Sequence, residues 1–189
     1  ISMAFWNIPG VSEASTLLIL ILAIIAIIRI KTDTSSRATC VVSMFNESTF
    51  VDQRFTRMLM KNNSISKELI HALLNSLYGM FAIEAIGFGR GLGVLDASSS
   101  KLKKMYMINP YIISDEDARE IVALFDIIKN RNVMDTEDEL GDDIREKFDR
   151  KVLQSIGHEE LYEAIKKSLL SMQHTRHTVK WSTGYSRES

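Results

Sequence analysis

Residues 14–28 read ASTLLILILAIIAII and contain no charged residue, proline or glycine. A helix that spans a bilayer needs about 20 mostly apolar residues, with a working range of about 17 to 25. The uncharged run is short, but it can extend through Arg29 and Ile30 because an arginine side chain reaches back to the headgroups. We therefore predict a single transmembrane helix over residues 14–30. The alternative is a buried core helix, which a shorter apolar run would favour.

The predicted membrane anchor combines an interfacial aromatic side chain, Trp6, with the apolar side chains of the span. Tryptophan is enriched where lipid headgroups meet the hydrocarbon core. The segment before the span contains no lysine or arginine, whereas Arg29, Lys31 and Arg37 end or follow it. The positive-inside rule then places the N-terminus outside and the C-terminal domain in the cytoplasm. The other anchor residues are Leu17, Leu18, Ile19, Leu20, Ile21, Leu22, Ile24, Ile25, Ile27 and Ile28.

The composition argues against several classes of protein. The chain has 189 residues and a net charge of −1, whereas domains that bind nucleic acid usually carry a basic face, so we expect no nucleic-acid partner. A single cysteine excludes an internal disulfide framework and a four-cysteine zinc site. No cofactor or metal motif is evident, and we expect none.

The sequence divides into five segments. Residues 3–13 form an N-terminal extracytoplasmic or interfacial segment, 14–30 the span, and 31–37 a polar linker. Residues 38–173 are predicted to form a mainly α-helical cytoplasmic domain, and residues 174–189 a flexible tail. Within the domain, the β-branched residues 38–44 and the loosely alternating residues 105–113 are predicted to pair as a minor two-stranded sheet.

Helical patterns fill most of the domain. We predict helices over residues 46–63, from residues 64–66 onward, from Ser114, and from the capping box Thr136-x-x-Glu139. Gly157 is predicted to separate the last two helices.

Residues 77–95 carry only two charges, Glu84 and Arg90. They favour a buried helical hairpin, and the alternative is a segment that dips into the membrane, where these charges would have to be paired. Four alternating glycines make two small-xxx-small pairs, which in a membrane helix allow close packing against a second helix. In a soluble domain the same glycines mark a helix end and a loop. They are Gly87, Gly89, Gly91 and Gly93.

No catalytic pattern is complete. The segment GFGRGLG at residues 87–93 does not have the G-x-G-x-x-G spacing of a dinucleotide site, and the residues before it read as helix rather than strand. Ser64-x-x-Lys67 and Ser98-x-x-Lys101 match a serine–lysine spacing but lack the companion motifs of acyl-transfer enzymes. We therefore predict a protein that is not an enzyme.

A chain with one span, a helical domain and no evident chemistry favours a structural or adaptor subunit of a larger membrane assembly, for example a secretion or conjugation machine. Its expected partners are the lipid bilayer and other subunits or further copies of itself. One alternative is a homo-oligomeric membrane-active effector or small channel that uses residues 77–95; another is a nucleotide-responsive membrane sensor. The residues predicted to bind a partner are Asp138, Glu139, Asp142, Asp143, Trp181 and Tyr185.

Overall fold

The computed structural model describes residues 26–29, 41–45, 56–58, 60, 64–89 and 95–178. These residues are mainly α-helical, which confirms the predicted fold class at this level. Short 3-10 turns, η1 (Pro110–Ile112) and η2 (Glu159–Leu161), precede two of the helices. The α-helices are α1 (Lys67–Leu74), α2 (Leu77–Ile86), α3 (Ser99–Leu102), α4 (Asp115–Lys129), α5 (Thr136–Leu140), α6 (Asp143–Gln154) and α7 (Tyr162–Thr178).

A small antiparallel sheet has β1 (Ala26–Arg29) in the middle, between β2 (Val41–Ser43) and β3 (Arg57–Met58). Strand β2 lies within the predicted strand 38–44, so that prediction is confirmed. Its partner is β1 and not residues 105–113, so the predicted pairing was wrong. Strand β3 lies inside the predicted helix 46–63, whose other residues fall mostly outside the described part of the chain.

Strand β1 occupies the end of the predicted transmembrane helix. Ile27 pairs with Ser43 and Arg29 with Val41, so residues 26–29 are extended and the prediction of one helix through 14–30 is wrong for them. Residues 14–25 lie outside the described residues. Among the helices that the structure does describe, none is by itself long and apolar enough to cross a membrane. Helices α1 and α2 reach that length and hydropathy only together, and they meet at an angle of 63°.

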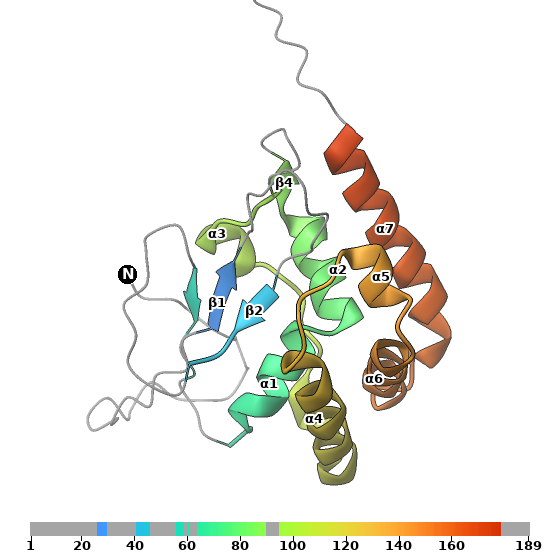
Figure 1. Cartoon of the computed structure of the whole chain (residues 1–189). Helices are drawn as coiled ribbons and strands as arrows, with labels where there is room; N and C mark the ends of the chain where they lie inside the picture. Colours follow the sequence, from blue (N-terminus) through green and yellow to red (C-terminus); the bar gives the residue numbers. More distant parts are fainter. Residues whose placement is uncertain are drawn as a thin grey trace, which may run out of the picture.

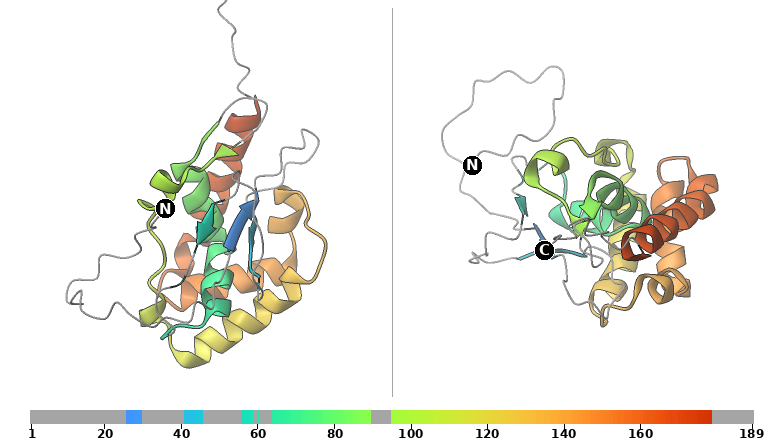
Figure 2. Two further views of the ribbon diagram at one scale, coloured as in Figure 1. Left: turned by 90° about the vertical axis from the view of Figure 1, so that its left-hand side faces the viewer. Right: turned by 90° about the horizontal axis from the view of Figure 1, so that it is seen from above.

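Helices α1 and α2 lie between the sheet on one side and α4 to α7 on the other (Figure 1). Strand β2 contacts α1, α4 crosses α1, and α7 runs along α2. The view from above keeps this order, with α7 on the side of α2 away from the strands (Figure 2, right). The apolar faces of α1 and α2 are therefore covered by protein, and Leu73, Leu77 and Ile83 have almost no exposed surface.

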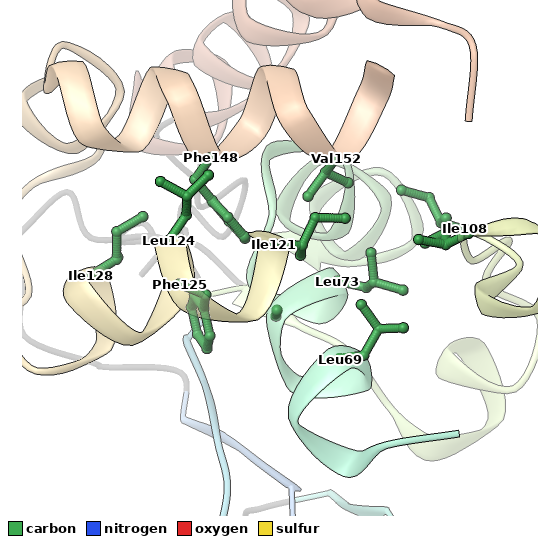
Figure 3. Close-up of a cluster of buried hydrophobic side chains, with 11 residues drawn as sticks. Leu69, Leu73, Ile108, Ile121, Leu124, Phe125, Ile128, Phe148 and Val152 are labelled. Carbon is green, nitrogen blue, oxygen red and sulfur yellow. The ribbon is translucent and has the colours of Figure 1, made fainter. Parts of the chain in front are cut away.

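The largest apolar cluster fills the space where α1, α4 and α6 meet (Figure 3). The rings of Phe125 and Phe148 stack with their centroids 5.4 Å apart. Leu73 and Ile121 approach the same cluster from α1 and α4. Burying one side chain of this size contributes about 1.5–3 kcal/mol relative to leaving it exposed, so this cluster fixes how the three helices pack.

The helix starts predicted at residues 64–66 and at Ser114 agree with the structure, whereas the start predicted at residue 46 lies outside the described residues. Ser114 caps α4, because its hydroxyl oxygen accepts a hydrogen bond from the Asp117 amide at 3.1 Å. Gly157 has a φ of +76°, a conformation that favours glycine, and it lies between α6 and α7 as predicted. The predicted capping box Thr136-x-x-Glu139 is wrong, because Asp135 is the N-cap residue of α5 and its side chain makes no capping hydrogen bond. The stretch that follows is also not one helix, because α5 ends at Leu140 and α6 begins at Asp143.

Two other predictions need correction. Residues 105–113 form no strand; residues 105–109 have no regular secondary structure, and the turn η1 follows them. The predicted helical hairpin over 77–95 consists of α2 followed by a small antiparallel pair, β4 (Phe88–Gly89) and β5 (Leu95–Asp96). Helix α7 also continues through residues 174–178, where the sequence favours a flexible tail.

Candidate functional site

The break between α1 and α2 is held by several buried hydrogen bonds. Ser76 starts α2, where its hydroxyl donates to the Leu73 carbonyl at 2.7 Å and accepts from the Gly79 amide at 3.2 Å. A Cβ atom at Gly79 would lie 2.4 Å from the carbonyl oxygen of Leu74. The two helices can therefore turn this sharply only because residue 79 has no side chain.

Helix α6 holds both sides of the break with two side chains one turn apart. The Arg145 Nη2 atom donates to the carbonyl oxygen of Asn75 at 2.7 Å, at the end of α1. The Asp149 Oδ1 atom accepts from the Leu77 amide at 2.7 Å, at the start of α2. Each helix end has backbone groups without a partner inside its own helix. Arg145 and Asp149 supply partners for one such carbonyl and one such amide.

Arg145 and Asp149 also form an ion pair with each other, with Nε and Oδ2 at 2.7 Å and side-chain exposures of 4 % and 0 %. Burial raises the pKa of Asp149 above the usual aspartate value, and the adjacent guanidinium opposes this rise. Glu139 lies 3.3 Å from Arg145 Nη1 and 2.9 Å from Arg131 Nη2. The pair is thus the centre of a buried charge network that joins α5 and α6 to the helix break.

Asn75 connects this network to the sheet. Its Oδ1 atom accepts from the Val42 amide at 3.0 Å, and its Nδ2 atom donates to the Val42 carbonyl at 2.9 Å. His71 Nε2 lies 2.7 Å from the same carbonyl oxygen, which requires this nitrogen to carry a proton. Burial lowers the pKa of His71, so the ring is neutral at pH 7. The arrangement satisfies the backbone of Val42 on the side facing α1.

A second candidate site lies on the surface. We call residues 103–113, which connect α3 to α4, the strap. Along it Met105 and Met107 pack against the apolar cluster around Leu74, and Ile108 is buried. Tyr106, between the two methionines, is 85 % exposed. The strap therefore holds an aromatic ring out in solvent while its neighbours are anchored in the core.

Hydrogen bonds fix the strap at further points. The Tyr78 hydroxyl of α2 approaches the Tyr106 carbonyl oxygen at 3.4 Å. Ser64 and Tyr111 join their hydroxyl groups at 3.2 Å, near the start of α1. Tyr111 is half exposed, at 52 %, and Ile112 is exposed at 61 %. The strap thus exposes three large apolar or aromatic side chains, Tyr106, Tyr111 and Ile112, on a backbone that is fixed at several points.

The positive charge of this surface comes from the residues that open the strap. Lys103 and Lys104 are exposed and precede Tyr106 by three and two positions. The sequence contains both lysines, but the exposure of Tyr106 was not predicted from it. The signal that would have revealed it is the alternation of Met105, Tyr106 and Met107, which places the tyrosine opposite the two methionines.

The predicted acidic partner-binding residues divide into two groups. Glu139 is buried in the network around Arg145. Asp142 caps α6 by accepting from the Arg145 amide at 2.9 Å, and it pairs with Arg131 at 2.8 Å. Asp138 and Asp143 are exposed, so partner binding stays a prediction for them. Trp181 and Tyr185 lie outside the described residues.

The predicted glycine pattern does not lie on one helix where the structure describes it. Gly87 caps the end of α2, and a Cβ there would meet the Leu95 side chain at 2.3 Å; Gly89 belongs to β4. Gly91, Gly93 and Arg90 lie outside the described residues. Packing of these glycines against a second copy therefore stays a prediction.

Glu84 is buried and has a partner that was not predicted, because Arg176 of α7 binds both its carboxylate oxygens, at 2.6 and 3.2 Å. A helix, α2, precedes the glycine segment, whereas a dinucleotide-binding loop follows a strand. Within the described ranges, no group of three or more histidine, cysteine, aspartate or glutamate side chains is arranged to hold a metal ion.

Comparisons with protein-family models, with curated proteins and with solved structures find no match.

Proposed function

We propose that this chain is a non-catalytic docking domain of a larger assembly, and that it holds an anionic partner against the strap. The observation that carries the proposal is the presentation of Tyr106, which is 85 % exposed, anchored by its packed neighbours, and preceded in the chain by the exposed Lys103 and Lys104. A tyrosine ring offers a large contact area, and a lysine pair supplies attraction to negative charge.

The fixed backbone of the strap supports a binding role. Ordering a loop and its side chains on association opposes binding, at about 0.5–1.5 kcal/mol for each immobilised side chain. Here Met105, Met107 and Ile108 already hold the backbone before any partner arrives. The proposed surface therefore needs little further ordering, which is the advantage of a preorganised site.

The buried charges support the non-catalytic part of the proposal. Arg145 and Asp149 contact each other and backbone groups of the helix break. Glu139 contacts Arg131 and Arg145. These contacts explain the burial of Arg145, Asp149 and Glu139 as a requirement of the fold, with no need for a substrate.

The first candidate partner is an anionic membrane surface, in keeping with the predicted anchor. The apolar residues 14–25 precede the sheet, and exposed tyrosine and isoleucine side chains suit the interface between headgroups and hydrocarbon. If residues 26–29 stay in β1, the 12 residues 14–25 are shorter than a helical span requires, so contact through the strap would strengthen attachment.

The second candidate partner is a nucleic acid, and Tyr106 is the observation that favours it. Single-stranded nucleic acids bind where aromatic rings stack on bases and basic side chains follow the phosphates. The composition alone argued against this class because the net charge is −1. The exposed ring beside two lysines is a local feature that the net charge does not describe.

Binding of the full-length chain to two probes tests the proposal and separates the candidates. The probes are phosphatidylcholine vesicles with and without phosphatidylserine, and labelled single-stranded and duplex oligonucleotides. We expect the unaltered chain to bind one of the two anionic probes. Tyr106→Ala and Lys104→Glu should each weaken the affinity for that probe about tenfold. The control Lys147→Glu on α6 should leave the affinity unchanged. Failure of both anionic probes, or equal effects of control and strap variants, would refute the proposal.

A further inference from the structure

Asn75 receives contacts from two parts of the molecule that are far apart in the sequence. Its backbone carbonyl is held by Arg145 of α6 at 2.7 Å. Its side chain binds the amide and the carbonyl of Val42 in β2 at 3.0 and 2.9 Å. Both sets of hydrogen bonds are buried, so neither is readily replaced by water.

Asp149 fixes the residue on the other side of the break. Its carboxylate accepts from the Leu77 amide at 2.7 Å and is oriented by Arg145 through two further contacts, at 2.7 and 3.2 Å. The position of Asn75 is thus set from α6 on both sides, by a carbonyl contact at Asn75 and an amide contact two residues later.

We propose that Arg145 and Asp149 form a latch that couples strand β2 to helix α6 through Asn75. When the latch opens, the backbone at residue 75 can rotate, and the side chain can no longer hold both polar groups of Val42. Strand β2 and the helix break then open as one cooperative unit.

The latch also affects residues 26–29, because β1 pairs with β2 through Ile28 and Val42. Opening of β2 removes a partner from β1, whose other partner in the described residues is the short strand β3. The latch is therefore a conformational device that decides whether residues 26–29, the end of the apolar stretch, are kept in the sheet. This inference is independent of the partner that binds the strap.

Amide hydrogen exchange of the full-length chain, followed by NMR, tests the coupling. The variants are Arg145→Lys and Asp149→Asn, which disturb the latch without contacting Val42 directly. We expect the Val42 amide to exchange about tenfold faster in each variant, a factor that about 1.4 kcal/mol produces. Arg150→Lys, on the same helix with its side chain more exposed, is the matched control and should leave Val42 unchanged.

The Phe148 amide in the middle of α6 reports global unfolding. If Val42 and Phe148 accelerate by the same factor, the variants only destabilise the whole domain and the latch is overturned. An unchanged Val42 amide in both variants also overturns it. Asn75→Ala removes the Val42 contacts directly and shows the exchange rate expected for a released strand.

A measurement on the unaltered chain covers the case in which the variants do not fold. Exchange of the Val42 and Leu77 amides is followed at rising urea concentrations below the unfolding transition. The latch predicts the same opening free energy and the same urea dependence for both amides. Different urea dependences would mean that the strand and the helix break open independently, which contradicts the coupling.

Discussion

The change from Arg145 to methionine is the sharpest test of the packing described here. Methionine keeps most of the length of the side chain, so little space is lost, but the guanidinium is removed. Asp149 and Glu139, with exposures of 0 % and 11 %, then lose a buried cation. The Asn75 carbonyl also loses its 2.7 Å donor.

The size of the effect follows from burial. Removing one partner of a buried ion pair destabilises a protein by about 3–5 kcal/mol, because the remaining charge has no compensation. We expect Arg145→Met to lower the free energy of unfolding by this amount. The loss is a large part of the total free energy of unfolding of a typical domain, which is about 5–15 kcal/mol. Arg131 also contacts Glu139, so the loss arises mainly at Asp149.

The assay is urea unfolding of the full-length chain, followed by circular dichroism, with Arg150→Met as the matched control. Arg150 is one turn away from Glu146 on α6 and is 34 % exposed. Its ion pairs and its stacking on Tyr162 together contribute about 1 kcal/mol. The double variant Arg145→Met with Asp149→Leu removes both buried charges and should recover about 1 kcal/mol or more relative to Arg145→Met alone.

Two results would refute this reasoning. If Arg145→Met and Arg150→Met lower the free energy of unfolding equally, burial does not determine how much the Arg145–Asp149 ion pair contributes to stability. A double variant less stable than Arg145→Met alone would mean that the contacts of Asp149 stabilise the fold without the guanidinium.

Three further predictions concern pH and packing, and urea unfolding measures each of them. Because burial lowers the pKa of His71 below 6.5, the unfolded chain takes up the proton first, so stability falls as the pH drops below 6.5, and His71→Gln should remove this slope. Gly79→Ala should cost about 2–3 kcal/mol, since the new Cβ meets backbone carbonyls at 2.4 and 2.5 Å, whereas Gly141→Ala should change stability by less than about 1 kcal/mol. The hydrogen bond from Arg131 lowers the pKa of Asp142 below 3.8, so the contribution of this carboxylate to the free energy of unfolding is lost as the pH falls below 3.8. Asp142→Asn should make the free energy of unfolding depend less steeply on pH in this range, and an unchanged dependence would contradict this.

Local signals in the sequence were sufficient to predict much of the helical part of the fold. Ser114 and Gly157 act within a few residues of their own positions, and the structure has a helix start at the first and a helix end at the second. The stripe that includes Ile121 and Phe125 faces the core because helical periodicity alone decides that side.

Contacts between residues far apart in the sequence could not be predicted from it. Nothing near residues 26–29 indicates that they pair with residues 41–43 in place of continuing a helix, since an apolar run suits both structures. Asn75 and Val42 are 33 positions apart, and Arg176 and Glu84 are 92 apart. Glu139 appeared available for a partner because its buried position becomes visible only when α5, α6 and the helix break are assembled.

The exposure of the Tyr106 ring in the strap could not be predicted for a different reason. Lys101, Lys103 and Lys104 are visible in the sequence, and Pro110 cannot donate a hydrogen bond to a central strand. Which of the apolar side chains between Met105 and Ile113 point outward depends on the cluster under them. Their exposures therefore had to come from the structure.

Size and composition of the purified native assembly test the docking role most directly. The unaltered chain and Tyr106→Ala would be purified from the native source in nanodiscs that keep the native lipid, and measured by native mass spectrometry, with Lys147→Glu as the control. The proposal predicts that the unaltered and control chains are recovered in a larger complex and that Tyr106→Ala is recovered with its partner lost. Recovery of all three chains in the same state, whether complexed or alone, would contradict it.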